Sequence, residues 1–227
     1  MRYPLVIFAA AMLTLTACAN TEQGVRRPLL PRTTAPTWSD RIVDWPESAQ
    51  KVARQMGLRY GAPHEITDTQ LVWFGNGPWK RTVLSREGTP HDWPEPHVDV
   101  LEQVIDLRVD PKRADDIARF DGSLIIDPSK GELSAHCGRE SANFLAINLA
   151  RDIATGKRSV KNARAFYAQA IAEAAAGQKP EEMRRLVFAE AEGAPEDRDH
   201  PATAAEKQAA KRKAGVASER SAKRASP

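Results

Sequence analysis

Residues 70–84 read Gln-Leu-Val-Trp-Phe-Gly-Asn-Gly-Pro-Trp-Lys-Arg-Thr-Val-Leu, and this stretch decides the fold. Two β-rich runs, 70–74 and 79–84, flank a turn that contains Asn-Gly, the strongest short-range signal for a β-hairpin. A second hairpin is predicted where the apolar runs 123–126 and 132–136 bracket the turn residues 127–131. The two hairpins predict a small antiparallel sheet of about four strands.

The segments before and after these hairpins carry apolar residues at helical spacing. They predict an N-terminal helix over 48–60 and two longer helices over 139–155 and 160–176. Gly156 fits the end of the first long helix and Ser159 caps the second, so the short connection predicts an antiparallel helix pair. The predicted fold class is therefore α+β, with the sheet packed against the N-terminal helix and the C-terminal helix pair.

The region between the two hairpins is less regular. Residues 85–97 contain three prolines and are predicted to form a surface loop. Residues 98–102 are ambiguous and fit a helical turn as one alternative. Apolar residues alternate with charged residues over 103–109, which predicts a half-buried strand, and a short helix is predicted over 111–120.

The first eighteen residues have the composition of a secretory signal. One basic residue, Arg2, precedes thirteen uncharged residues over 5–17, too few to span a bilayer. The following Leu15-Thr16-Ala17-Cys18 resembles the lipobox of bacterial lipoproteins. This resemblance implies removal of residues 1–17, a diacylglyceryl group on the Cys18 sulfur, and acylation of the new amine. Ala19, which follows the cysteine, favours the outer membrane in the proteobacterial sorting pattern. The alternative is a signal peptide whose cysteine is not modified.

Composition divides the rest of the chain into a tether, one domain and a tail. Residues 18–37 hold three prolines and predict a flexible tether, 38–188 predict a single α+β domain, and 189–227 predict a disordered charged tail. Within that tail, 204–214 is predicted to be transiently helical. The formal net charge is +3, but residues 200–227 carry +5, so the remainder is slightly acidic. This balance argues against a nucleic-acid-binding domain.

Two polar clusters contain residue types that could carry chemistry. Cys137 is expected at a helix N-terminus, where the helix dipole favours a thiolate, but the adjacent His136 points to the opposite face. A catalytic thiol would need His91 or His97 as its base, and the alternative is a half-buried thiol. His91 and His97 lie in a stretch with two carboxylates, and these are zinc-ligand types, whereas the alternative is a solvated loop.

Aromatic side chains concentrate in the first half of the predicted domain. Trp73, Phe74, Trp79 and Trp93 could line a groove for sugar rings or peptides, whereas the alternative is that they serve only in packing. The sequence contains no nucleotide-binding loop and no common zinc or hydrolase motif, so no cofactor is predicted. With Cys18 lipidated, Cys137 is the single remaining cysteine and no internal disulfide is predicted.

Two functions are consistent with these features. The first is a non-enzymatic lipoprotein, anchored by lipid in the bacterial outer membrane and facing the periplasm, that binds another envelope component. Its expected partners are an envelope protein, peptidoglycan or anionic lipid. The basic tail could be a second segment that contacts anionic partners, or it could serve only to increase solubility. The second is an envelope hydrolase or thiol enzyme that uses Cys137 with histidines.

Overall fold

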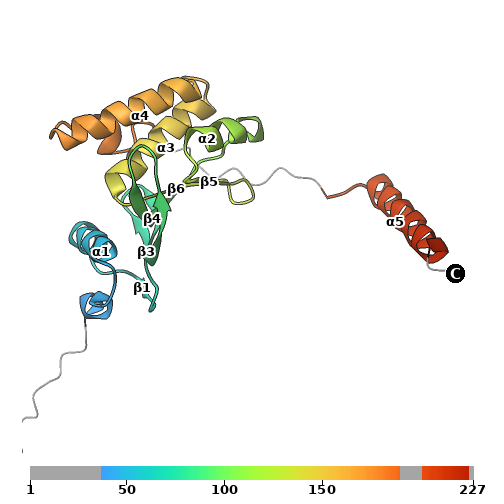
Figure 1. The fold of residues 1–227 in the computed structure, drawn as a ribbon, viewed down its shortest axis with the longest axis horizontal. Helices are drawn as coiled ribbons and strands as arrows, with labels where there is room; N and C mark the ends of the chain where they lie inside the picture. Colours follow the sequence, from blue (N-terminus) through green and yellow to red (C-terminus); the bar gives the residue numbers. More distant parts are fainter. Residues whose placement is uncertain (1–36, 190–200, 225–227) are drawn as a thin grey trace, which may run out of the picture. The chain divides into compact units, whose positions relative to one another are not determined.

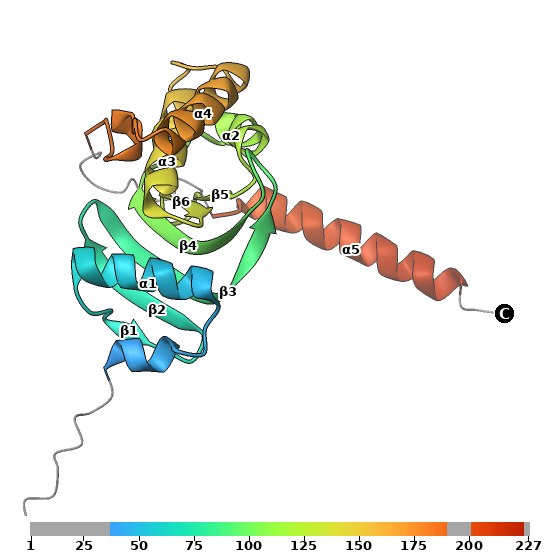
Figure 2. The same cartoon turned by 60° about the vertical axis from the view of Figure 1, so that its left-hand side comes forward.

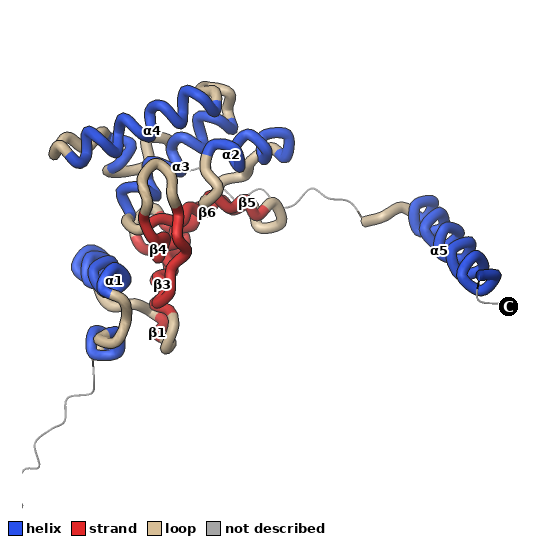
Figure 3. The backbone as a smooth tube through the Cα atoms, viewed as in Figure 1, coloured by secondary structure: helices blue, strands red, loops and turns tan. Residues whose placement is uncertain are grey.

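A computed structural model describes residues 37–189 and 201–224, and it describes no side chains in 217–224. Within these ranges the chain forms one antiparallel sheet in the strand order β1-β2-β3-β4-β6-β5, together with α-helices and short 3₁₀ helices (Figures 1 and 3). The strands are β1 (Glu65–Ile66), β2 (Gln70–Asn76), β3 (Trp79–His91), β4 (His97–Asp106), β5 (Leu124–Asp127) and β6 (Glu132–Cys137). The helices are η1 (Trp38–Ile42), α1 (Glu47–Tyr60), η2 (Pro111–Arg113), α2 (Ala114–Phe120), α3 (Glu140–Ala154), α4 (Val160–Ala175), η3 (Glu181–Met183) and α5 (Ala204–Arg224).

The predicted class, α+β with an antiparallel sheet, is confirmed, but the described sheet has six strands rather than about four. Both predicted hairpins form, as β2–β3 and β5–β6. The strands outside the two hairpins are the two-residue β1 and the long β4, which joins the hairpins into one sheet. β4 contains the first part of the strand predicted over 103–109 but ends at Asp106, and residues 98–102 belong to it rather than to a helical turn.

The prediction of a surface loop over 85–97 was wrong for most of that stretch. β3 continues to His91, and β4 begins at His97 and pairs with it in the order Thr89↔Asp99, Pro90↔Val98 and His91↔His97. The prolines led to the loop prediction because proline removes a hydrogen bond from the strand ladder. This effect excludes proline only from central strands, and proline is tolerated at the edge of a sheet. β2 pairs with β3 only over 79–85, so Pro90 lies where that side of β3 has no neighbouring strand.

A break in the β3–β4 register bends this long hairpin at a glycine. The pairing shifts between Leu84 and Thr89. At Gly88 an added Cβ would lie 2.4 Å from Val98 Cγ1, 2.7 Å from Val100 Cγ1 and 2.8 Å from the Asp99 carbonyl oxygen. Glycine is therefore required here, because only its backbone can approach β4 this closely. The irregularity separates the regularly paired part of β3 and β4, up to Leu84, from the short end of the hairpin, which carries His91 and His97.

Two apolar clusters hold the sheet and helices together. The predicted stripe on α1, formed by Ala49, Val52, Ala53 and Met56, is buried in a cluster that also contains Trp73 from β2. Figure 2 shows α1 lying across one face of the sheet, where it packs against β3 and β4. The second cluster joins β4, β5 and β6 to α2, α3 and α4, the last two connected by residues 155–159.

The C-terminal segment contains the helix α5, which is longer than the transiently helical stretch predicted over 204–214. Side chains 201–216 are all exposed, so these residues have no packing face. Among the helices of residues 37–189 and 201–224, none combines the length and the apolarity needed to cross a bilayer. The signal and lipobox residues 1–18 lie outside the described ranges.

Candidate functional site

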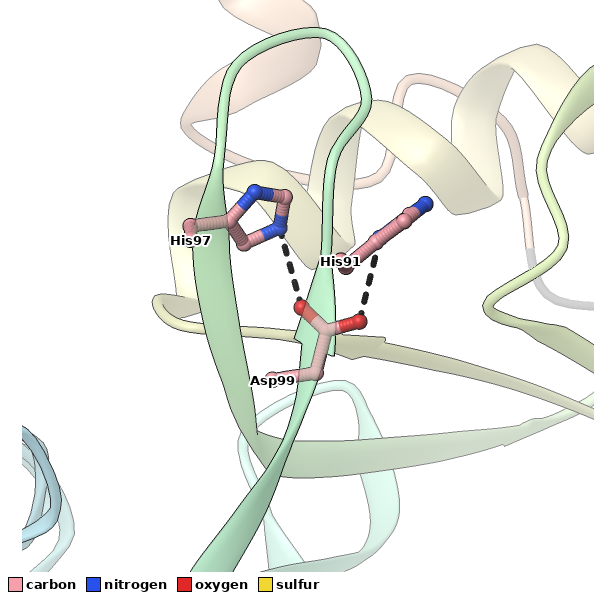
Figure 4. Close-up of side chains that lie close together, drawn as sticks. All are labelled: His91, His97 and Asp99. Atoms are coloured by element: carbon pink, nitrogen blue, oxygen red, sulfur yellow. Dashed lines mark ion pairs between the residues drawn. The ribbon is translucent and has the colours of Figure 1, made fainter.

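The free end of the β3–β4 hairpin brings two histidines and an aspartate together. His91 ends β3 and pairs directly with His97, the first residue of β4, while Asp99 follows two residues later. Residues two apart on a strand share a face, so His97 and Asp99 project to the same side. Figure 4 shows the Asp99 carboxylate between the two rings, with Oδ2 3.1 Å from His91 Nδ1 and Oδ1 2.9 Å from His97 Nε2.

The second nitrogen of each ring faces an oxygen. The Nδ1 atom of His97 lies 2.7 Å from the carbonyl oxygen of Glu95, and an Nδ1–H group donates to this carbonyl. The Nε2 atom of His91 lies 4.0 Å from Oδ1 of the buried Asp121. The hydrogen bond of His97 Nδ1 directs its Nε2 atom towards Asp99, whereas the 4.0 Å contact of His91 with Asp121 is too long for a hydrogen bond.

The Asp99 carboxylate is poorly compensated. Its side chain is only 5% exposed, and among residues 37–189 and 201–216 neither its Oδ1 atom nor His91 Nδ1 has a hydrogen-bond partner of acceptable geometry. The short distances within the cluster are therefore contacts between charges or lone pairs rather than aligned hydrogen bonds. Desolvation raises the pKa of Asp99 above its usual range, although the charges of His97 and His91 oppose this rise.

Cys137 lies next to this cluster, and its neighbour is His97 rather than His136. The Cys137 Sγ atom is 3.5 Å from His97 Nε2, whereas His136 Nε2 lies 3.3 Å from Glu102 Oε1. Of the two histidines that the sequence suggested as a possible base, the structure therefore places His97 next to the sulfur. Burial, followed by the charge of Asp99, raises the pKa of the Cys137 thiol to about 12. A thiol held in this state is a poor nucleophile at neutral pH.

The hairpin end is held against the helices by Trp93, which lies in the connecting turn. Its ring centroid is 4.6 Å from that of Tyr167 on α4 and 5.9 Å from that of Phe120 on α2. The Arg164 guanidinium lies over the same ring at 4.1 Å and also donates to the Phe120 carbonyl. These contacts fix the turn between His91 and His97, so the histidine pair has a rigid support.

The four aromatic residues considered for a binding groove do not share a surface. Trp73 and Trp79 are 0% and 1% exposed and belong to different core clusters, which agrees with their packing alternative. Phe74 is 45% exposed at the opposite end of the sheet from Trp93, beside His64. A groove lined by all four side chains is therefore excluded.

A cationic cleft adjoins the hairpin end. It has a volume of about 660 Å³ and lies between α1 and the N-terminal end of α3, where His97, Gly138 and Arg139 line it. Its charged lining residues are Lys51, Arg59, Arg139, Lys179 and Glu140. The single acidic residue, Glu140, is buried and accepts hydrogen bonds from its own neighbours, so the open face is positive.

Sequence reasoning found His91, His97 and Cys137 but missed Asp99 and the cleft. Asp99 could have been found from its spacing of two residues from His97, had 98–102 been assigned as strand. The cations of the cleft come from separate elements, and no local pattern marks them. A search against protein-family models, curated proteins and solved structures finds no match to this chain.

Proposed function

We propose that this chain is a lipid-anchored protein of the bacterial cell envelope, facing the periplasm from the outer membrane, whose domain binds an anionic envelope component without catalysis. The lipobox-like Leu15-Thr16-Ala17-Cys18 supports the anchor. The cationic cleft between α1 and α3 supports the binding role, and it is the observation that carries the proposal.

The cleft has the size and charge of a site for a ligand with several negative groups. Its volume of about 660 Å³ lies within the usual range for small-ligand pockets. Arg59 pairs with Glu140, with Nη1 2.7 Å from Oε2. In the described part of the chain, no ion pair engages Lys51, Arg139 or Lys179. These three cations are therefore available to carboxylates or phosphates, the groups that peptidoglycan and anionic lipids present.

The state of Cys137 supports a binding role over a thiol enzyme. Its side chain is 7% exposed, and its raised pKa keeps the sulfur protonated near neutral pH. We expect Cys137 in the folded protein to resist a thiol-reactive probe at pH 7 and to react after denaturation. Rapid labelling of the folded protein would instead support the second candidate, an enzyme in which His97 activates the thiol.

The binding proposal is tested by cosedimentation of the full-length protein with peptidoglycan sacculi and with vesicles containing anionic lipid. The wild-type protein is expected to bind either the sacculi or the anionic vesicles, and this binding should weaken steeply with salt. The triple variant Lys51→Gln, Arg139→Gln, Lys179→Gln is expected to lose most of that binding. The matched control replaces two exposed lysines and one exposed arginine outside the cleft and the basic tail, Lys112, Lys161 and Arg184, with glutamine. Equal binding by both triple variants would refute the cleft as the site.

The anchor is tested separately by mass spectrometry of the protein isolated from bacteria. A chain that begins at Cys18 and carries acyl mass is expected. An intact Met1, or a processed N-terminus without acyl mass, would refute the lipoprotein proposal while leaving the binding experiment valid.

A further inference from the structure

We propose that the end of the β3–β4 hairpin binds a divalent transition-metal ion of the zinc class through His91 Nδ1, His97 Nε2 and the Asp99 carboxylate. The site goes beyond the anion-binding function proposed above, because the cleft does not depend on it. Two imidazoles and one carboxylate are the ligand types that zinc uses when a coordination position stays open.

The ligand atoms already converge without a metal ion. One ligand atom from each of His91, His97 and Asp99 can be chosen so that all three lie within 4.8 Å of one another. A tetrahedral zinc ion with bonds of about 2.0–2.1 Å separates its ligand atoms by about 3.3 Å. The two nitrogen-to-oxygen distances, 3.1 Å and 2.9 Å, need only a small expansion to reach this value. To bind one ion, the nitrogen atoms of His91 and His97 must move closer to each other by at most about 1.5 Å, and rotation of the side chains can supply this movement.

Two buried polar atoms of the cluster have the lone pairs that a cation would accept. Asp99 Oδ1 and His91 Nδ1 are both buried, and within the described part of the chain both lack a hydrogen-bond partner. A buried carboxylate without aligned donors is costly, and proteins satisfy such groups by pairing or by metal coordination. A cation placed among the three side chains would accept a lone pair from each of these atoms and neutralise the Asp99 charge.

The surroundings of the His97 ring match the outer shell of a metal site. Histidines that bind metals usually donate their other ring N–H to a backbone carbonyl or a carboxylate, which fixes the tautomer. His97 Nδ1 faces the Glu95 carbonyl at 2.7 Å, and His91 Nε2 faces Asp121 Oδ1 at 4.0 Å. His97 therefore has an outer partner that directs its Nε2 atom towards Asp99, whereas the His91–Asp121 distance would have to shorten before the two could form a hydrogen bond.

Space and access are also present. The His91 and His97 side chains are 22% and 26% exposed, and cavities of about 220 Å³ and 330 Å³ lie on their two sides. A metal ion can enter from solvent, and a water molecule or a ligand can complete its coordination. The Cys137 thiol would lose its 3.5 Å contact with His97 Nε2, a small cost because S–H is a weak donor.

The test is a zinc titration of purified full-length protein after chelator dialysis, with a chromophoric chelator as competitor. We expect one zinc ion per chain, retained through gel filtration, and no competition from a large excess of Mg²⁺, which avoids nitrogen ligands. His91→Ala, His97→Ala and Asp99→Asn should each weaken binding at least tenfold. His64→Ala is the matched control, because His64 lies beside Phe74 and away from the hairpin end.

Thermal unfolding separates loss of the site from loss of the fold. Zinc should raise the Tm of the wild type and of His64→Ala, and it should leave the Tm of the three ligand variants unchanged. The variants should unfold cooperatively without metal, and Asp99→Asn should be at least as stable as the metal-free wild type because it removes an uncompensated charge. No retained zinc, or equal zinc affinity in His64→Ala and in the ligand variants, would overturn the proposal. Displacement of the bound zinc by Mg²⁺ would overturn it as well.

Discussion

Replacing Glu140 with glutamine should destabilise the domain, because it removes the charge of one buried carboxylate that connects four elements. Its Oε1 atom accepts hydrogen bonds from Tyr60 Oη at 2.7 Å, Trp79 Nε1 at 2.7 Å and Gln103 Nε2 at 3.1 Å, and its Oε2 accepts from Arg59 at 2.7 Å. These donors come from α1, β3 and β4, while Glu140 begins α3. The carboxylate therefore joins the two apolar clusters at their boundary.

The magnitude follows from the change in charge. Hydrogen bonds to a charged group contribute about 1.5–3 kcal/mol to stability, and hydrogen bonds between neutral groups contribute about 0.5–1.5 kcal/mol. In Glu140→Gln the three hydrogen bonds to Oε1 change from the first kind to the second, which lowers stability by about 3 kcal/mol. The Arg59 side chain is 50% exposed, so its ion pair adds at most about 1 kcal/mol. Relief of the desolvation cost of the carboxylate offsets part of this loss. We expect a net destabilisation of about 2 kcal/mol.

The measurement is the free energy of unfolding from urea denaturation, with a fall in Tm of about 4–8 °C as a second readout. The matched control is Glu173→Gln on the exposed side of α4, which should change stability by less than about 0.5 kcal/mol. Burial, followed by Glu140, raises the pKa of Tyr60. Glu140→Gln should therefore lower that pKa towards its usual range, which ultraviolet titration can measure. Equal stability of the Glu140 and Glu173 variants would refute this reasoning.

Three further outcomes follow from close packing and burial. Gly88→Ala should cost about 1–3 kcal/mol in urea denaturation and weaken zinc binding, because its Cβ would strike β4 beside Asp99. Gly122→Ala, with open space around its Cβ, should be neutral. Burial raises the pKa of Tyr167 well above the usual tyrosine value of 10.0, so the unfolded chain loses this proton first and the free energy of unfolding falls as pH rises above 10.0. Tyr167→Phe should reduce that slope by about 1.4 kcal/mol per pH unit, and an unchanged slope would contradict the assignment.

Local patterns in the sequence predicted the parts of the fold that depend on neighbouring residues. The stripe on α1 was buried as expected, and the turn at 75–78 closed the β2–β3 hairpin. The extension of β3 through Pro90 could not be predicted, because proline is tolerated there only where β2 no longer pairs with β3. That condition is set by strand order, a tertiary property.

The candidate site shows the same division. Residue type alone identified His91 and His97 as possible metal ligands, and simple alternation could have added Asp99. Only the folded chain placed His91 opposite His97, buried Asp99 between them, and left Asp99 Oδ1 without a donor. The sequence by itself determined the signal-like N-terminus, the α+β class and two of the three proposed ligands, His91 and His97. The tertiary structure decided their convergence, because the contacts that bury a charge join residues distant in the chain.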